Sequence, residues 1–326
     1  MMKLPRRNFL HLAAGAATLP SMSRFAWAQG YPTRPVRIVV GYAAGGPADI
    51  VARLIAQWLS ERLGQPFLVE NRTGAATNIA TEAVVRAPAD GYTLLFVHAA
   101  NAFNTTLYDK LNFNFIRDIV PVASLIRSPS VLEVNPSVPA KTVPEFIAYA
   151  KANPGKLTMA SSGIGTPSHV FGELFKVMTS VDIVHVPYRG LAAALTDLLG
   201  GQVQVTFASV PSSIAYIKAG RLRALAVTSA KRSEALPDLP TVGEFVPGYE
   251  TSLWLGLGAP KGTSAEIIDM LNQETNAALT DPKLKPRLAD LGGTVLTGSP
   301  ADFGKLISDE TEKWGKVIRA LNIKAD

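Results

Sequence analysis

The fold is decided by the stretch from Val36 to Leu63, VRIVVGYAAGGPADIVARLIAQWLSERL. Its first part, Val36–Tyr42, is apolar and rich in β-branched residues, which predicts a buried strand. Its last part, Ala48–Leu63, repeats apolar side chains at helical spacing. The glycine-rich turn Gly41–Asp49 (GYAAGGPAD) joins the two. A buried strand that passes through a glycine turn into an amphipathic helix is the building unit of an α/β fold.

The same alternation continues along the chain. Such alternation indicates an α/β protein with parallel sheets whose two faces are covered by helices. Further strands are predicted at 67–70, 92–97, 120–126, 131–134, 157–160, 182–186, 203–208, 222–228 and 252–259, and helices at 78–86, 143–153, 168–178, 191–199 and 214–218.

Three helical segments close the chain, at 265–279, 283–291 and 301–321, without strands of their own. They are expected to pack back onto the first part of the chain. We therefore predict two α/β lobes, with lobe I formed by residues 29–125 plus 250–326 and lobe II by residues 126–249. Two crossings, near 100–126 and near 249–254, would serve as a hinge. A cleft between two lobes is a favoured place for a small ligand.

Composition narrows the classes of function. The 326 residues include no cysteine and four histidines, which excludes thiol chemistry and argues against a histidine-rich metal centre. Hydrophobic residues make up 47% of the chain, too many for a disordered protein. The net charge is +6, but +4 of it lies in residues 1–28, so a nucleic-acid partner is not indicated. No cofactor or metal is indicated either.

The N-terminus has the pattern of an export signal. Arg6-Arg7 end a basic segment, apolar residues follow from about Phe9 to Leu19, and Ala26-Trp27-Ala28 gives a cleavage pattern of small residues. The RRNFL string is typical of twin-arginine export, with an ordinary secretion signal as the alternative. We predict that residues 1–28 are removed after about Ala28, which leaves a periplasmic protein without a membrane anchor.

Two turns rich in small residues are the main candidates for a binding site. In the first, Ala44, Gly45 and Gly46 allow backbone N–H groups at a helix N-terminus to approach a ligand, which favours an anion such as a carboxylate. Asp49 is expected in the first helical turn, where it would orient the loop rather than touch an anionic ligand. The alternative is a tight structural turn without a ligand.

The second turn, Ala160–His169 (ASSGIGTPSH), follows the same logic in lobe II. A strand ends in hydroxyl and glycine residues, and a helix begins near Pro167, a favoured first-turn residue. Thr166 or Ser168 could also simply cap that helix, which is compatible with binding. Two such turns that face each other would form a polar cleft for a carboxylate. The candidate ligand-binding residues here are Ser161, Ser162, Gly165, Thr166 and Ser168.

Further candidates follow strand ends, where α/β sheets bind ligands. His98 and Asn101 could hydrogen-bond a substrate oxygen, with a partly buried hinge residue as the alternative for His98. Tyr188 could stack on a ligand or hydrogen-bond it, whereas Arg189 is expected to be a solvated surface residue and His185 a structural one. The G-x-S-x-G, H-E-x-x-H and S-x-x-K signatures of hydrolases are missing, so catalysis is unsupported.

Taken together, these segments resemble the Bug-type receptors, the periplasmic solute-binding components of tripartite tricarboxylate transporters. The resemblance covers essentially all of the chain after the signal. It implies the type II periplasmic binding-protein fold, in which two lobes close on a ligand, and membrane components of a transporter as partners. It also implies that loops Ala43–Asp49 and Ser161–Ser168 hold one carboxylate with backbone groups, hydroxyls and waters. The segments that carry it include GYAAGGPAD, ENRTGAATNIA, ASSGIGTPSH, DIVHVPYRG, LLGGQVQVTF and IKAGRLRALAVTS.

One departure from the family pattern concerns the ligand. Ala208 stands where many relatives carry Asp, so a partner for an ammonium group is missing there and an amino-acid ligand is disfavoured. We expect a carboxylate without an amino group, with an aromatic acid as one candidate, bound by a monomer. Two alternatives stay open: a receptor that signals to a sensor protein, and an enzyme on the same fold, against which the lack of Cys and the scarcity of His argue.

Overall fold

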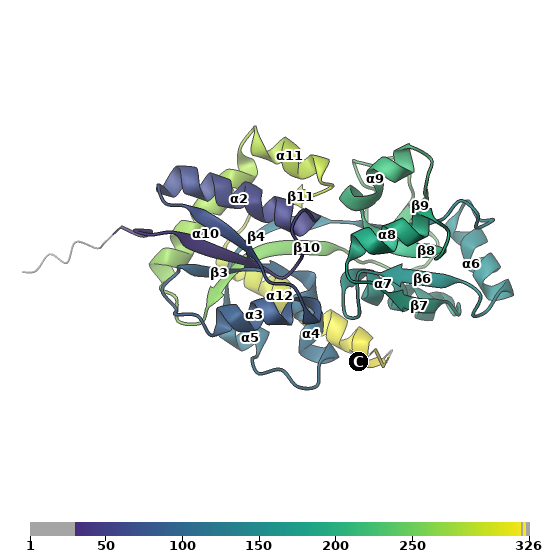
Figure 1. The fold of residues 1–326 in the computed structure, drawn as a ribbon, viewed down its shortest axis with the longest axis horizontal. Coiled ribbons are helices and arrows are strands. Elements are labelled where there is room, and N and C mark those ends of the chain that lie inside the picture. Colours follow the sequence, from purple (N-terminus) through teal and green to yellow (C-terminus); the bar gives the residue numbers. More distant parts are fainter. Residues whose placement is uncertain (1–29, 321, 324–326) are drawn as a thin grey trace, which may run out of the picture.

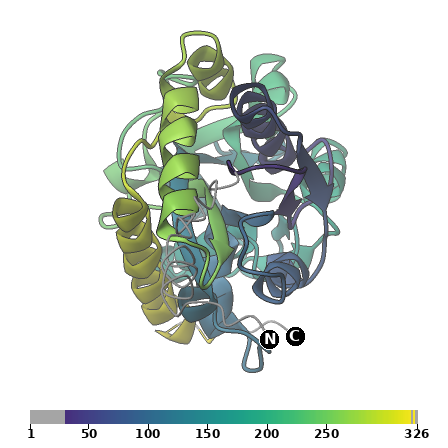
Figure 2. The same ribbon diagram turned by 90° about the vertical axis from the view of Figure 1, so that its left-hand side faces the viewer.

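The computed structural model describes residues 30–320, 322 and 323, which form two α/β lobes side by side along the long axis (Figure 1). In the end view of Figure 2, lobe I faces the viewer and lobe II lies behind it. The predicted signal peptide, residues 1–28, lies outside the described residues. Among the helices that the structure describes, none combines the length and the hydropathy needed to cross a membrane.

Lobe I is built on a six-stranded mixed sheet with the strand order β11-β4-β10-β3-β1-β2. β1 is parallel to both β2 and β3, whereas β10 is antiparallel to β3 and β4. The prediction of purely parallel sheets is therefore wrong, because β10 begins where the chain returns from lobe II and must run away from that lobe. The strands are β1 (Val36–Val40), β2 (Phe67–Asn71), β3 (Thr93–His98), β4 (Ile119–Ser128), β10 (Leu253–Pro260) and β11 (Thr294–Val295).

Helices cover both faces of this sheet, because successive strand residues point to opposite sides. Leu94 and Phe96 belong to a core shared with α2, α10 and α11, and Leu95 and Val97 to a core shared with α3, α4 and α12. The helices are α2 (Pro47–Leu63), α3 (Asn78–Val85), α4 (Ala99–Leu107), α5 (Phe115–Asp118), α10 (Ala265–Thr280), α11 (Leu284–Asp290) and α12 (Pro300–Ala320), with a short 3₁₀ turn η1 (Ala75–Thr77).

Lobe II has a five-stranded mixed sheet with the order β7-β6-β8-β5-β9. β6 is parallel to β7 and β8, and β5 is antiparallel to β8 and β9. The strands are β5 (Ser130–Val134), β6 (Thr158–Ser161), β7 (Val184–Pro187), β8 (Val205–Ser209) and β9 (Arg223–Val227). The helices are α6 (Val143–Ala152), α7 (Pro167–Thr179), α8 (Leu191–Leu199) and α9 (Val210–Lys218), with a 3₁₀ turn η2 (Val242–Glu244).

The chain crosses between the lobes where β4 passes into β5 and again just before β10, and Thr228 joins the two crossings. Its Oγ1 accepts the N–H of Ser130 and donates to the carbonyl of Thr251, both at 3.0 Å. Its backbone N–H donates to the Ser130 carbonyl, and its carbonyl accepts the Thr251 N–H, both at 2.9 Å. Four hydrogen bonds from one buried residue thus tie the outgoing and returning segments together.

The C-terminal helix α12 contacts both lobes. Its Trp314 is fully buried, with the ring centroid 4.9 Å from that of Phe103 in α4 and 5.3 Å from that of Phe171 in α7. Nearby, Gly165 of lobe II lies so close to Leu107 of lobe I that a Cβ would not fit. One apolar core is therefore continuous from lobe I into lobe II.

Apart from the two 3₁₀ turns, three elements escaped the pattern analysis: α4, the four-residue α5 and β11. Helix α4 has the sequence AANAFNTTL, whose Asn and Thr residues have low helix propensity. It forms because most of its residues are buried and because a capping box joins His98 and Asn101 at its start. Strand β11 has two residues, too few to show a period.

Candidate functional site

A cavity of about 580 Å³ lies between the lobes. Its wall in lobe I is the segment Tyr42–Ala48, and its wall in lobe II includes Ser162, Ser168 and the start of α8. Ser128 and Ser130 line it on either side of the first crossing between the lobes. The cavity therefore adjoins both lobes and the segment that connects them.

The lobe I wall is the glycine turn between β1 and α2. Gly45 has φ of +81°, a left-handed conformation that glycine adopts without strain. The carboxylate of Asp49 holds this turn: it accepts the Gly45 N–H, the Arg53 Nε–H and the Asn71 amide, each at 2.9 Å. Burial alone would raise the pKa of Asp49, but these hydrogen bonds together lower it, so the group is ionised and occupied by its own loop.

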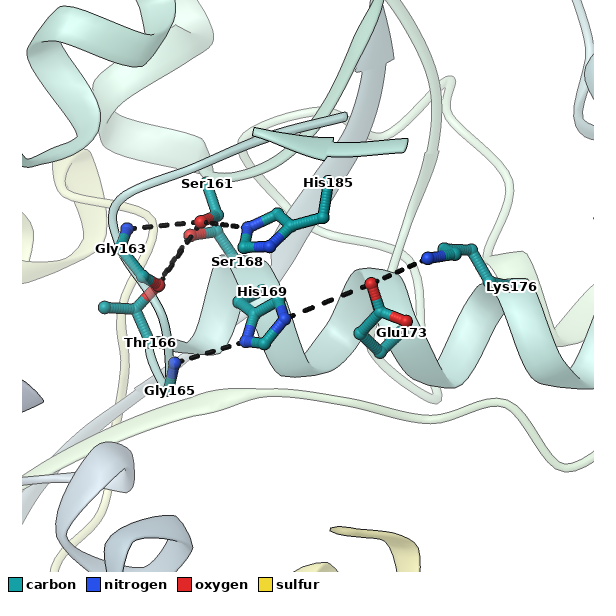
Figure 3. Close-up of polar contacts among 9 residues, drawn as sticks. All are labelled: Ser161, Gly163, Gly165, Thr166, Ser168, His169, Glu173, Lys176 and His185. Carbon is teal, nitrogen blue, oxygen red and sulfur yellow. Dashed lines mark hydrogen bonds and ion pairs between the residues drawn. The ribbon is translucent and has the colours of Figure 1, made fainter. Parts of the chain in front are cut away.

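The lobe II wall is a network of hydroxyl groups between β6 and α7 (Figure 3). Ser168 Oγ accepts the Ser162 N–H at 2.9 Å and lies 3.0 Å from Ser162 Oγ and 3.1 Å from Thr166 Oγ1. Thr166 donates to the carbonyl of Gly163 at 2.6 Å. Because Thr166 uses its own proton on Gly163, Ser168 is the donor in its contact with Thr166, and the Ser162 hydroxyl donates to Ser168. The Ser162 hydroxyl can donate to a ligand by turning from Ser168 into the cavity.

Four helices begin at the cavity. The backbone N–H groups of a first helical turn have no partner within the helix. At each of these described N-termini no N-cap side chain accepts them either. Such groups and the helix dipole favour negative charge. The helices are α2 after Gly46, α7 after Thr166, α8 after Gly190 and α9 after Ser209.

Arg189 is the one charged side chain among the described residues that line the cavity. None of the lining residues is acidic, so an ammonium group would find no counter-charge there. The rest of the lining is largely apolar, with Val51, Ile126 and Leu253 among its members. The chemistry suits an anionic head on a carbon skeleton.

His98 adds an uncharged polar group to the wall. Its Nδ1 accepts the Ala100 N–H and lies 3.3 Å from the Tyr42 hydroxyl. Burial lowers the pKa of His98 to about 3, so the ring is neutral. Burial likewise raises the pKa of Tyr42. Both groups can therefore offer hydrogen bonds without adding charge.

The structure places the predicted residues in two groups. Ala44, Gly45, Gly46, His98, Ser162 and Ser168 line the cavity. The other predicted residues do not line the cavity: Asp49, Asn101, Ser161, Gly165, Thr166, Tyr188 and Ala208.

The residues outside the lining have other contacts. Asn101 bonds Thr77 and Thr81, and the Tyr188 hydroxyl donates to Asp197 at 2.7 Å. The alternation of side chains along a strand explains why Ala208 does not line the cavity. Its neighbours Phe207 and Ser209 line the cavity, so Ala208 points to the other face of β8, where it packs in a small apolar core.

The sequence analysis missed several lining residues. Ser209 and Ser212 follow a strand end and precede a helix with Pro211 in its first turn, the same signal that marked the other two loops. Arg189 was expected to be a solvated surface residue; it is exposed and also borders the cavity. Ser128 and Ser130 had no local signal, because only the crossing of the chain brings them to the site.

Two α/β lobes, joined by crossing segments around a cavity that favours an anion, define a periplasmic solute-binding protein. Solved structures with the same architecture include R. palustris Rpa4515 with adipate, 40% identical with a TM-score of 0.86, which covers 90% of this chain and 99% of that one. They also include MatC from Rhodopseudomonas palustris with bound malate, at 33% identity and a TM-score of 0.82 over 88% of this chain and 100% of that one.

The chain belongs to the family described as the tripartite tricarboxylate transporter family receptor, whose model matches residues 51–323. The protein BugT of Bordetella pertussis is 36% identical over 300 residues, 91% of this chain and 92% of that protein. The structure of the periplasmic binding protein BugD is 35% identical, with a TM-score of 0.84. The family consists of binding receptors and not of enzymes. The predicted family, fold class and receptor function are thereby confirmed.

Proposed function

We propose that this protein is an exported receptor that captures a small carboxylate between its lobes and delivers it to the membrane components of a tripartite tricarboxylate-type transporter. The observation that carries the proposal is the convergence of four helix N-termini on one cavity without an acidic side chain in its lining. Relatives of known structure hold adipate and malate, both carboxylates.

The proposed contacts divide between the walls. Backbone N–H groups at Gly45 and Gly46 and the hydroxyls of Ser162 and Ser168 would hold one carboxylate, in part through water. Arg189 would meet a second anionic group. Arg189 borders the cavity, and among the described residues no ion pair joins it to an acidic side chain. A dicarboxylate without an amino group fits this arrangement best.

Ligand binding would favour the closed arrangement of the lobes, since a ligand that touches both binds that form better. The proposed lobes are residues 29–125 plus 250–326 and residues 126–249, with residues 126–128, the end of β4, moving with lobe I because the first crossing follows β4. A monomer suffices for this mechanism, because one chain supplies both walls.

Thermal unfolding against a panel of carboxylates and amino acids tests the function. A ligand at 100 times its Kd stabilises the native state by about 2.7 kcal/mol. For a protein of this size that is about 5–10 °C in Tm. We expect the largest shifts from dicarboxylates and none from aspartate or glutamate. An amino acid as the best ligand, or no shift from any carboxylate with ligand-free protein, would contradict the proposal.

Replacement of Arg189 tests the second anionic contact. Arg189→Gln should weaken dicarboxylates about tenfold, the usual effect of one charged hydrogen bond, and leave a monocarboxylate of the same length nearly unchanged. Isothermal titration calorimetry gives both affinities. Equal losses for the two ligands would show that Arg189 does not distinguish them.

Export is proposed separately, with residues 1–28 as a twin-arginine signal cleaved after about Ala28. Mass spectrometry of the periplasmic protein gives the new N-terminus. Accumulation of the uncleaved chain in a strain without the twin-arginine translocase supports that route, and normal processing there assigns export to the general secretion pathway.

A further inference from the structure

Two imidazole rings stack next to the loop between β6 and α7 (Figure 3). His169 lies in the first turn of α7 and His185 in β7, with ring centroids 4.0 Å apart and planes inclined by 20°. Neither ring lines the cavity. Each ring forms a hydrogen bond with the loop of residues 161–165.

His169 holds the far end of the loop. Its Nδ1 accepts the N–H of Gly165 at 3.2 Å, at a residue whose φ is +77°. Nδ1 can accept only while it carries no proton, so the proton of the neutral ring is on Nε2. That Nε2 faces Glu173 Oε1 at 4.0 Å, and Glu173 in turn pairs with Lys176 at 2.9 Å.

His185 holds the near end. Its Nε2 shares a hydrogen bond of 2.6 Å with Ser161 Oγ, and the same hydroxyl accepts the Gly163 N–H at 3.2 Å. The two rings therefore fix both ends of residues 161–165, the segment from which Ser162 reaches the cavity.

The contact between Ser161 and His185 does not form a nucleophile and its base. Ser161 is fully buried and does not line the cavity, so a bound ligand cannot reach its hydroxyl. No carboxylate of the described residues hydrogen-bonds the His185 ring, as the third member of a catalytic triad would. The contact positions the loop.

We infer that His169 and His185 are positioning residues for the ligand: as an uncharged, stacked pair they hold residues 161–165 in the shape that presents Ser162 and Ser168 to a carboxylate. This inference rests on the proposed function. A proton on His169 Nδ1 would replace the acceptor of the Gly165 N–H with a second donor. A charge on either ring would also lie directly against the other ring.

The surroundings keep the pair neutral. The charged groups that face it among the described residues are Glu173 and Lys176 of α7. Burial, the neighbouring ring and Lys176 lower the pKa of His169 to about 3. Burial and Lys176 lower the pKa of His185 to about 4. Both rings are therefore uncharged at neutral pH.

Two replacements of His169 separate positioning from mere packing. His169→Asn places an amide oxygen near the position of Nδ1 and keeps an acceptor for Gly165 without a titrating group, whereas His169→Leu removes the acceptor. Val143→Ala, a buried position in α6, serves as a matched control for lost stability in lobe II. Calorimetric titration of the exported protein with adipate and with malate at pH 7.5 gives the affinities.

We expect His169→Leu to weaken binding about tenfold, the loss of one well-placed hydrogen bond, and His169→Asn to stay within about threefold of wild type. Val143→Ala should lower Tm without weakening binding. The ¹⁵N spectrum should show His169 with an unprotonated Nδ1 at pH 7.

Three results would overturn the inference: wild-type affinity in His169→Leu, equal losses in the Asn and Leu variants, or a protonated His169 Nδ1. A wild-type protein that binds no carboxylate of the panel refutes the proposed function, and the inference falls with it. A wild-type protein that binds while the variants fail to differ refutes the inference alone.

Discussion

Replacement of Thr228 by valine should destabilise the connection between the lobes more than any loss of packing explains. Valine has nearly the same shape as threonine, so the change removes the hydroxyl and little else. The Ser130 N–H and the Thr251 carbonyl both lose their hydrogen bonds to Oγ1, and both residues are 1% exposed. Water therefore has no ready access to either group.

The size of the effect follows from those two groups. A buried polar group left without a partner costs about 1–3 kcal/mol. Two such groups, offset by about 1 kcal/mol for the extra buried methyl, give a loss of about 3 kcal/mol in the free energy of unfolding. Thr228→Ser keeps the hydroxyl and loses a methyl, which costs about 1 kcal/mol.

Urea unfolding measures both variants, and hydrogen exchange locates the damage. The amide of Ser130 should exchange slowly in the wild type and in Thr228→Ser, and much faster in Thr228→Val. Ligand affinity should fall in Thr228→Val as the two crossings separate. Equal stability losses in the valine and serine variants, or an unchanged Ser130 exchange rate, would refute this account of the crossings.

Three further outcomes are expected. Asp49→Asn should lower the free energy of unfolding by about 2 kcal/mol, because the Gly45 turn loses its charged acceptor. Ligand binding should weaken for the same reason. If calorimetry shows tighter binding instead, the main effect of Asp49 is to repel the ligand. Trp314→Ala should lower the free energy of unfolding, measured in urea, by about 4 kcal/mol. The radius of gyration of the ligand-free protein in X-ray scattering should increase, because the contact between α12 and Phe171 of lobe II is lost. An unchanged radius would mean that α12 does not hold the lobes together. Stability should peak near pH 6.5. Below it, the unfolded chain binds protons at His98, His169 and His185 that the folded chain does not, because burial lowers the pKa of each in the folded state. Above it, Glu133 of β5, whose pKa burial raises to about 8, stays protonated in the folded chain while it is ionised in the unfolded one, so stability falls by about 2 kcal/mol between the peak and pH 8. Urea unfolding from pH 4.5 to 8 checks both limbs, and Glu133→Gln should flatten the alkaline one.

Local sequence signals were sufficient for most helices and strands. The helix from Leu191 to Leu199 has the predicted bounds, and α2 begins one residue before the predicted Ala48. These elements were predictable because apolar periodicity and Gly or Pro at their ends are properties of neighbouring residues. Helix α4 was missed because its stability comes from burial against α12 and the sheet, which no local pattern records.

The two loops of the candidate site, after β1 and after β6, were likewise predictable in part from local sequence and in part only from the structure. Their glycines, hydroxyls and following helices marked Gly45, Ser162 and Ser168 from sequence alone, since backbone N–H groups at a helix start have a chemistry that does not depend on the rest of the fold. The sequence did not indicate that Thr166 would point its hydroxyl at Gly163 instead of the ligand. That choice depends on the shape of the loop.

The amino-acid sequence by itself determined the α/β class, the two turns built for an anion and the family, because these depend on the order and spacing of residues along the chain. Only the tertiary structure decided that β10 runs antiparallel, that Thr228 joins the two crossings, that Arg189 borders the cavity and that His169 stacks on His185. Each of these contacts joins residues far apart in the chain or depends on which face of a strand a side chain takes. Such contacts form when the two sheets and their helices pack. The free energy of that packing is distributed over many residues, and the local sequence around each of them does not indicate the contact.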